Sequence, residues 1–160
     1  MNLVYKHTSG GTLWQSDRKG LEALGQGGQE GGSDAGQDPF DPKKLFLVVC
    51  AEELDAPAKF ATMPDVEGFK LPLFDCIISD PDQALLRKAL KPVVEAIVKA
   101  LERGKKVQVH CNMGLNRSGL VVGLTLRRLG VPGEAAVALI RKARGHFALT
   151  NASFYQMVLK

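Results

Sequence analysis

The sequence lacks the features that would place the protein in a membrane or outside the cell. Its longest uninterrupted apolar run, residues 45–51, holds only seven residues, whereas a membrane-spanning helix needs roughly 20. The N-terminal segment carries basic residues without an apolar stretch between them, so we expect no secretory signal. Three cysteines are an odd number and too few for a disulfide scaffold, which favours a reducing compartment. We therefore expect a cytoplasmic protein with no membrane partner.

Aromatic residues and metal-ligand patterns are also scarce. Aromatics make up 6% of the chain and do not alternate with basic residues, which argues against a surface that stacks single-stranded nucleic acid. The three histidines (His7, His110 and His146) are not spaced with the cysteines as metal ligands would be, so we expect neither a metal nor another cofactor. The net charge of +4 suits an anionic ligand but does not by itself identify one.

The length and composition indicate one globular domain. With 160 residues, 45% of them hydrophobic and 24% charged, the chain fits a single domain of ordinary size. The composition departs from this average over residues 25–39, which hold six glycines and almost nothing apolar. We interpret this stretch as a mobile surface loop inside a domain that spans residues 1–160.

Hydrophobic periodicity predicts strands that alternate with helices. We expect a hairpin from residues 3–5 and 12–14 and further strands at residues 45–49, 69–74 and 105–110. Helices are expected after Ser16 as an N-cap, after Asp80 as an N-cap with Pro81 at the first helical position, from Ser118, over residues 132–144, and from Asn151. This order predicts an α/β fold, with a central, mainly parallel sheet flanked by helices.

Residues 110–118, with the sequence HCNMGLNRS, lie between a predicted strand and a predicted helix. A loop that enters a helix N-terminus points several backbone N–H groups into one concavity, where the positive end of the helix dipole also acts. Gly114 permits a tight curve, and Arg117 can return its guanidinium to grip two phosphate oxygens. Such a positive field favours the thiolate of a cysteine at the position of Cys111. The segment therefore predicts a phosphate cradle with a nucleophile.

The pattern His-Cys-x-x-Gly-x-x-Arg-Ser resembles the signature of the cysteine-dependent protein phosphatases. The short chain and the late position of the motif are similar to the dual-specificity branch, and this resemblance implies the protein tyrosine phosphatase-like fold. It also implies that Cys111 is the nucleophile that forms a cysteinyl-phosphate and that Ser118 donates to its sulfur. His110 would help to hold the loop in shape. Phosphate binding would fall to the loop residues Asn112, Met113, Gly114, Leu115, Asn116 and Arg117.

The family pattern requires a general acid between a strand end and the long helix, and three aspartates lie there. We choose Asp75, because it follows an apolar strand and should emerge at the sheet edge beside the loop. Asp80 has the spacing to Cys111 that is closest to many relatives. However, Asp80 and Asp82 belong to the predicted helix cap, and a carboxylate bound to backbone N–H groups is a poor proton donor.

These residues predict a phosphatase that hydrolyses phosphotyrosine in proteins, with phosphoserine and phosphothreonine left open. An alternative is an RNA 5′-triphosphatase or another phosphatase of non-protein substrates, because Asn116 before Arg117 is similar to the loop of such RNA enzymes. Only that alternative calls for a nucleic-acid partner. A third hypothesis, a non-catalytic phosphate-binding module, is disfavoured because Cys111, Arg117 and Ser118 are all present.

Overall fold

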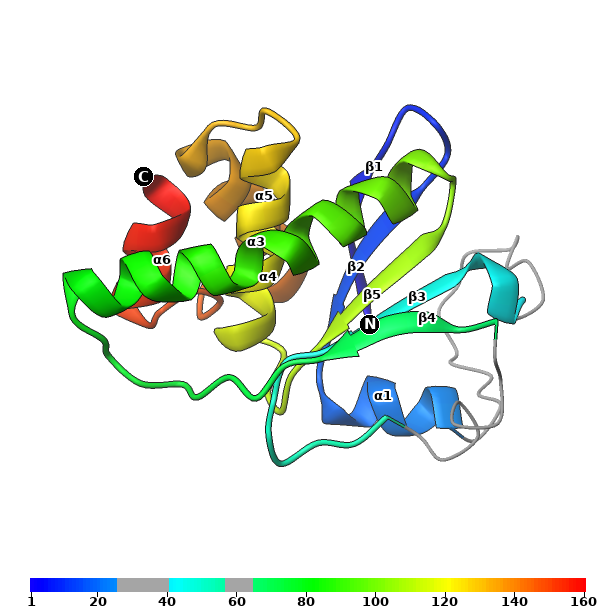
Figure 1. Ribbon diagram of the computed structural model, residues 1–160, viewed down its shortest axis with the longest axis horizontal. Coiled ribbons are helices and arrows are strands. Elements are labelled where there is room, and N and C mark those ends of the chain that lie inside the picture. Colours follow the sequence, from blue (N-terminus) through cyan, green and yellow to red (C-terminus); the bar gives the residue numbers. More distant parts are fainter. Residues whose placement is uncertain (26–40, 57–64) are drawn as a thin grey trace.

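The computed structural model describes residues 1–25, 41–56 and 65–160 (Figure 1). Apart from Gly25, which ends a helix, the glycine-rich loop expected at residues 25–39 lies outside the described residues. No helix in the described segments is both long enough and apolar enough to cross a membrane.

In the described part of the chain five strands form one sheet, and the order of the strands across the sheet differs from their order along the chain. The order is β1 (Asn2–Lys6), β2 (Thr12–Ser16), β5 (Lys106–His110), β3 (Leu45–Val49) and β4 (Glu67–Lys70). The first two strands form the expected antiparallel hairpin, and the remaining pairs are parallel. The prediction of a central, mainly parallel sheet is therefore confirmed.

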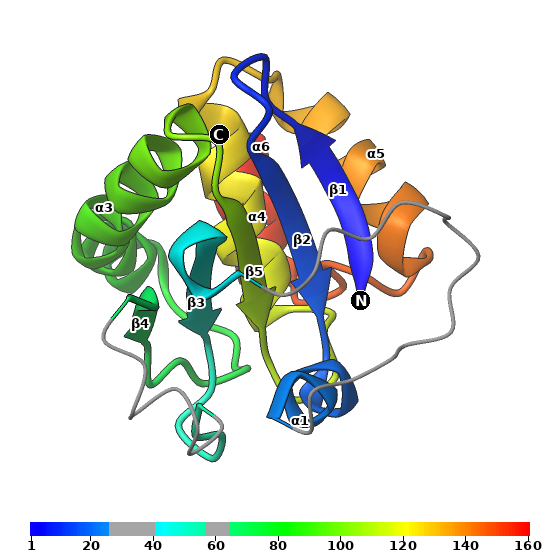
Figure 2. The same cartoon turned by 90° about the vertical axis from the view of Figure 1, so that its right-hand side faces the viewer.

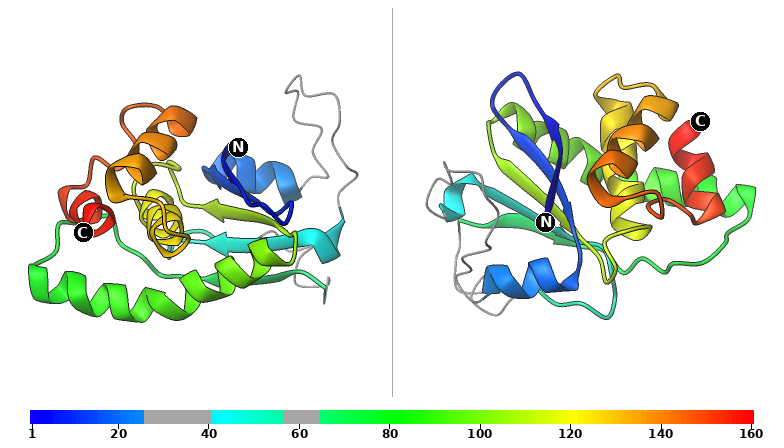
Figure 3. Two further views of the ribbon diagram at one scale, coloured as in Figure 1. Left: turned by 90° about the horizontal axis from the view of Figure 1, so that it is seen from above. Right: turned by 180° about the vertical axis from the view of Figure 1, so that it is seen from behind.

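Helices cover both faces of this sheet. They are α1 (Arg18–Gly25), α3 (Asp80–Glu102), α4 (Arg117–Arg128), α5 (Gly133–Arg144) and α6 (Ala152–Leu159), together with a short 3₁₀ helix, η1 (Pro42–Lys44). Helices α3 and α4 pack on β5, and α5 packs on β1. Figure 2 shows α4 and α6 behind the sheet, with α1 in front of the lower end of β2. Seen from above, α3 runs along one side of the molecule, next to the sheet (Figure 3).

The apolar patterns of the sequence correspond to the buried core. Every residue of β3 is buried, as expected of an apolar strand that is covered on both faces. Helix α4 is buried from Arg117 to Leu126, because it lies between the sheet and the other helices. These two elements hold the segments that carry the site in a rigid position.

Three local predictions were wrong in detail. The N-cap of α3 is Ser79, whose hydroxyl accepts from the backbone N–H of Asp82, so Asp80 is the first helical residue. At α1, Asp17 rather than Ser16 accepts the hydrogen bond from the Gly20 N–H, at 3.0 Å. The strand expected at residues 69–74 is β4, which begins at Glu67 and ends at Lys70, just before the stretch that contains Pro72. The Leu71 N–H still donates to the Val49 carbonyl of β3, but the Leu73 N–H turns back to the Leu71 carbonyl, so the backbone leaves the ladder there.

The carboxyl ends of three parallel strands meet at one edge of the sheet. Ser16 of β2 and Val49 of β3 both pair with His110, the last residue of β5. The segments that follow these strands therefore emerge side by side, at the edge where ligands bind in α/β sheets.

Candidate active site

The loop of residues 111–117 connects β5 to α4 at this edge of the sheet. Cys111 is the first residue after β5, and its side chain is buried. Its Sγ lies 3.2 Å from Oγ of Ser118, the second residue of α4. Gly114 adopts a positive φ of 65°, and a Cβ there would collide with the Arg144 side chain and the Ser16 backbone. A glycine is therefore required for the loop to curve so tightly.

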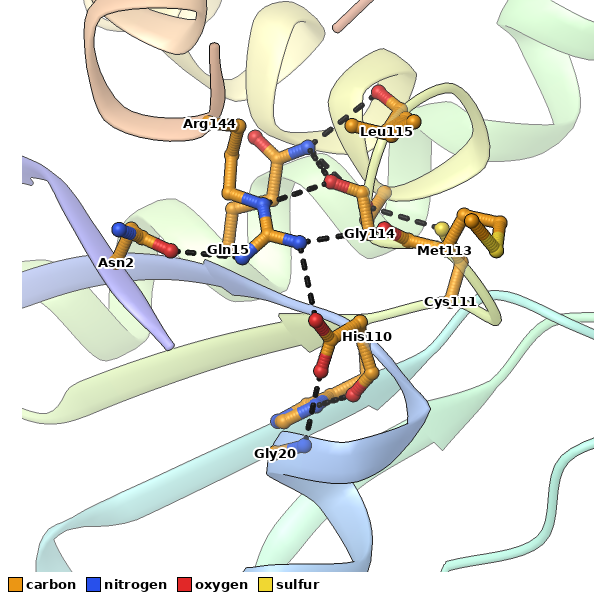
Figure 4. A network of polar contacts seen from close by, with 11 residues as sticks. Asn2, Gln15, Gly20, His110, Cys111, Met113, Gly114, Leu115 and Arg144 are labelled. Atoms are coloured by element: carbon orange, nitrogen blue, oxygen red, sulfur yellow. Dashed lines mark hydrogen bonds and ion pairs between the residues drawn. The ribbon is translucent and has the colours of Figure 1, made fainter. Parts of the chain in front are cut away.

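Carbonyl groups of this loop point outward, and those of residues 112–114 each accept a hydrogen bond from outside the loop. The Asn112 carbonyl accepts from the Arg18 N–H at 2.9 Å, and the Met113 carbonyl accepts from Arg144 at 3.2 Å. The Gly114 carbonyl accepts from both Arg144 and Gln15, each at 3.0 Å. Figure 4 shows these side chains reaching the loop from α5 and β2. The C=O and N–H of a peptide group point in opposite directions. When the carbonyls are held outward, the N–H groups of the same peptides therefore face the interior of the loop.

The backbone N–H groups of residues 112–117 have no acceptor among the described residues. Backbone donors near a helix N-terminus are normally satisfied by caps, water or a ligand. Six such donors lie in one tight loop at the positive end of the α4 dipole, an arrangement that can donate to the oxygens of a tetrahedral anion.

Arg117 adds a guanidinium that is held on one side and available on the other. Its two terminal nitrogens donate to the carboxylate of Glu53 at 2.7 and 2.8 Å, and one of them also donates to the Leu73 carbonyl. Its Nε is buried and has no partner within the described segments. The pKa of Arg117 is raised, chiefly by its hydrogen bonds to Glu53 and further by the charges of Cys111 and Asp75. The Nε side of the group can therefore bind an anion while Glu53 holds the other side.

His110 lies under the loop as a buried, neutral ring. Its Nδ1 is 3.3 Å from the Asp17 carbonyl oxygen, and its Nε2 is 3.3 Å from Oε1 of Gln108. Burial, which disfavours the charged form, lowers the pKa of His110 to about 4. This environment suits a structural role under the loop better than a proton donor.

Asp75 is the one of the three candidate aspartates that contacts the loop. Its carboxylate accepts from Nδ2 of Asn116 at 3.0 Å and from Nδ2 of Asn151 at 2.9 Å. Asn151 also caps α6, as expected, because its Oδ1 accepts from the Phe154 N–H. Asp75 thus bridges the loop of residues 111–117 and the start of the last helix.

The other two candidate aspartates take part in the start of α3. Asp80 accepts from the Gln83 side chain at 3.2 Å, and Asp82 accepts from the Ser79 hydroxyl at 2.5 Å. Both carboxylates are thus occupied within the first turn of the helix.

Comparisons with known proteins identify the family and the fold. Residues 31–160 match the family model of the dual specificity phosphatase catalytic domain.

The chain belongs to the dual-specificity phosphatase family.

It is therefore a protein-tyrosine/dual-specificity phosphatase. Solved structures of the same fold include human DUSP28, with a TM-score of 0.68 and 21% identity over 99% of this chain and 92% of that chain. They also include a mouse putative dual specificity phosphatase complexed with zinc tungstate, with a TM-score of 0.67 and 20% identity over 98% and 83% of the two chains. The tyrosine phosphatase OH1 of the Orf virus has a TM-score of 0.59 and 20% identity over 98% and 83%. No curated protein matches the sequence.

Sequence reasoning missed three side chains that shape the site of this phosphatase. Glu53 follows β3, so its place at the shared edge of a parallel sheet was a usable signal. Gln15 and Arg144 carried no such signal. One lies on a hairpin strand and the other in the last turn of α5, where a cation also fits the helix dipole.

Cys50 lies beside the loop as a buried thiol. Its backbone N–H donates to the His110 carbonyl at 2.7 Å, which places it next to Cys111 across the sheet edge. Burial raises the pKa of Cys50 well above its usual value, and Cys111 raises it further. Cys50 is therefore protonated, and its packing agrees with a core residue.

Proposed function

We propose that Cys111 attacks the phosphorus of a phosphate monoester and that Asp75 acts as the general acid. In the first step the Sγ–P bond forms and the P–O bond to the leaving group breaks. The proton of Asp75 passes to the leaving oxygen. In the second step a water molecule attacks phosphorus, the S–P bond breaks, and a proton of the water returns to Asp75. Inorganic phosphate is then released.

The observation that carries this proposal is the set of unpartnered N–H groups around Cys111. The backbone N–H groups of residues 112–117 have no acceptor within the described structure, and the buried Nε of Arg117 has none either. Together they would hold the three non-bridging oxygens of the phosphoryl group through both steps, as preorganised donors do for developing charge. The mouse phosphatase complexed with zinc tungstate supports oxyanion binding, because tungstate is tetrahedral like phosphate.

We propose that the substrates are phosphorylated proteins and that phosphotyrosine is the preferred residue. Phe74 precedes Asp75 and is 65% exposed, and Met113 within the loop is 68% exposed. Both give the mouth of the site apolar surface that an aryl phosphate can contact. Nothing comparable favours RNA, since the Asn116 side chain binds Asp75 and the Thr150 N–H. The free thiols of all three cysteines are consistent with a cytoplasmic location.

The nucleophile is tested by Cys111→Ser. We expect less than about a hundredth of the parent turnover of p-nitrophenyl phosphate, because a hydroxyl is a far weaker nucleophile than a thiolate. The variant should keep its fold and should still be stabilised thermally by inorganic phosphate. Residual turnover above a tenth of the parent rate contradicts the assignment. In the parent enzyme, preferential hydrolysis of triphosphate-ended RNA over a phosphotyrosyl peptide would favour the RNA alternative.

The general acid is tested by Asp75→Asn, with Asp80→Asn as the matched control. Asp75→Asn should lower kcat by roughly 10²–10⁴ for an alkyl phosphate, whose leaving group needs a proton, and by less for p-nitrophenyl phosphate. Asp80→Asn should change kcat little, because its carboxylate contacts only the first turn of α3. The reverse result would assign the acid to Asp80.

A further inference from the structure

Gln15 is a buried glutamine on β2 whose side chain contacts both the loop and the helix that follows it. Its Nε2 lies 3.0 Å from the Gly114 carbonyl, 3.4 Å from the Leu115 carbonyl and 3.2 Å from Oγ of Ser118. Carbonyl oxygens only accept hydrogen bonds, so the atom that faces them is the amide nitrogen. Figure 4 shows this side chain beside Gly114 and Leu115.

This contact determines where the Ser118 hydroxyl hydrogen points. A hydroxyl has one hydrogen, and the Ser118 oxygen already accepts from Gln15, so its hydrogen is directed elsewhere. The partner within reach is Sγ of Cys111, at 3.2 Å. A helical serine often donates instead to the carbonyl four residues earlier, here Gly114. That carbonyl is already occupied by Gln15 and Arg144.

The contact between Gln15 and Ser118 comes with a loss of stability of the folded state. Its Oε1 is buried and has no partner among the described residues. An unpartnered buried acceptor destabilises the folded state, so a glutamine here is poorly explained by stability. Conflicts of this kind between stability and local structure are expected at functional positions.

We propose that Gln15 is a positioning residue for the second half of the reaction. By accepting the Gln15 N–H, Ser118 keeps its hydrogen directed at the cysteine sulfur. When water attacks phosphorus, the S–P bond breaks and its electron pair stays on sulfur. The hydrogen bond from Ser118 stabilises the emerging thiolate, and its hydrogen remains on Ser118 throughout. This inference rests on the proposed function, in which Cys111 carries the phosphoryl group.

The test is Gln15→Met, which keeps the length of the side chain and removes its donors. All three acceptors lose Gln15, but the Gly114 carbonyl keeps Arg144 and the Leu115 carbonyl keeps the Leu149 N–H, so only the Ser118 oxygen is left without a donor. The melting temperature should therefore not fall. With p-nitrophenyl phosphate, kcat should drop about tenfold, as expected for one hydrogen bond to a charged group. The value of kcat/KM, which covers only the steps up to the phosphoenzyme, should stay within about threefold. Rapid mixing should then show a burst of nitrophenolate.

A double-mutant cycle with Ser118→Ala separates positioning from a general structural effect. If Gln15 acts through Ser118, then Gln15→Met should change kcat little in the Ser118→Ala background. Thr125→Val, which removes a buried hydroxyl of α4 remote from the loop, should leave the ratio of kcat to kcat/KM unchanged. Gln15→Leu is a second apolar replacement should Gln15→Met fail to fold.

Two results would overturn the inference. One is an equal loss of kcat and kcat/KM, or no loss of either, in folded Gln15→Met. The other is an effect of the same size with and without Ser118. An active Cys111→Ser enzyme would instead contradict the proposed function, so the two failures are distinguishable.

Discussion

At the scale of single residues, the site depends on how the Arg117 guanidinium is divided between Glu53 on one side and a phosphate on the other. Glu53 binds both terminal nitrogens of the guanidinium, and this contact lowers the pKa of Glu53 while it raises that of Arg117. The planar group is thereby fixed with its buried Nε and the adjacent N–H available to a phosphate. Two effects of Glu53 oppose each other, because its negative charge repels an anion while its geometry orients the guanidinium. Since 45% of the Glu53 side chain is exposed, solvent screens the repulsion, and we expect orientation to dominate.

Glu53→Ala should therefore lower kcat/KM for p-nitrophenyl phosphate about tenfold, because a mobile guanidinium binds the transition state less well. Glu52→Ala is the matched control, since Glu52 is the exposed neighbour and makes no ion pair within the described segments. It should change kcat/KM less than about twofold, as surface substitutions usually do. An increase in kcat/KM for Glu53→Ala would show that this carboxylate competes with the substrate instead.

At the scale of elements, α4 is held in place by close contact with α6. Gly123 of α4 faces Val158 of α6, and a Cβ at position 123 would lie 2.4 Å from a methyl carbon of that valine. Valine is stiff about χ1 and cannot move aside easily. The close approach of the two helices therefore requires a residue without a side chain at this position.

Gly123→Ala should destabilise the protein by about 1–2 kcal/mol, because the overpacking penalty exceeds the gain in helix propensity. Urea unfolding would measure this change. Val158→Ala should make room for the new methyl group, so the double variant should be more stable than the sum of the two single effects. Strict additivity would mean that the two residues do not oppose each other.

At the scale of the whole molecule, the buried neutral His110 makes folding stability depend on pH. Its pKa is about 4 in the folded state, against 6.5 as its ordinary value. Well above pH 6.5 both states are neutral and stability no longer depends on this group. As the pH falls from 6.5 towards 4, the unfolded chain binds a proton that the folded one does not, so stability is lost.

We expect the free energy of unfolding to be about 1 kcal/mol lower at pH 5.5 than at pH 7.5. His110→Gln should flatten this difference. The window lies above the range in which the shifted carboxylates of Asp17, Glu53, Glu67 and Glu95 titrate, since their pKa values are lowered from 3.8 or 4.5. A pH dependence that persists in His110→Gln would assign it to another group.

The sequence alone determined the features that depend on residues close together in the chain. The spacing of apolar residues located the strands and helices, and residues 110–118 predicted a phosphate cradle, because all of its expected donors lie within one loop. Element boundaries were less accurate. Ser79, Asp80 and Asp82 are all plausible helix starters, and only the backbone geometry distinguishes their positions.

The tertiary structure decided which side chains contact the loop and hold it in shape. Gln15 reaches Ser118 across 103 positions of the chain, and Glu53 reaches Arg117 across 64. No local periodicity encodes such pairs, because they exist only once β2, β3 and β5 lie side by side with their carboxyl ends at one edge. The sequence could therefore predict a phosphate-binding loop, but folding of the sheet was needed to bring in the residues that contact it.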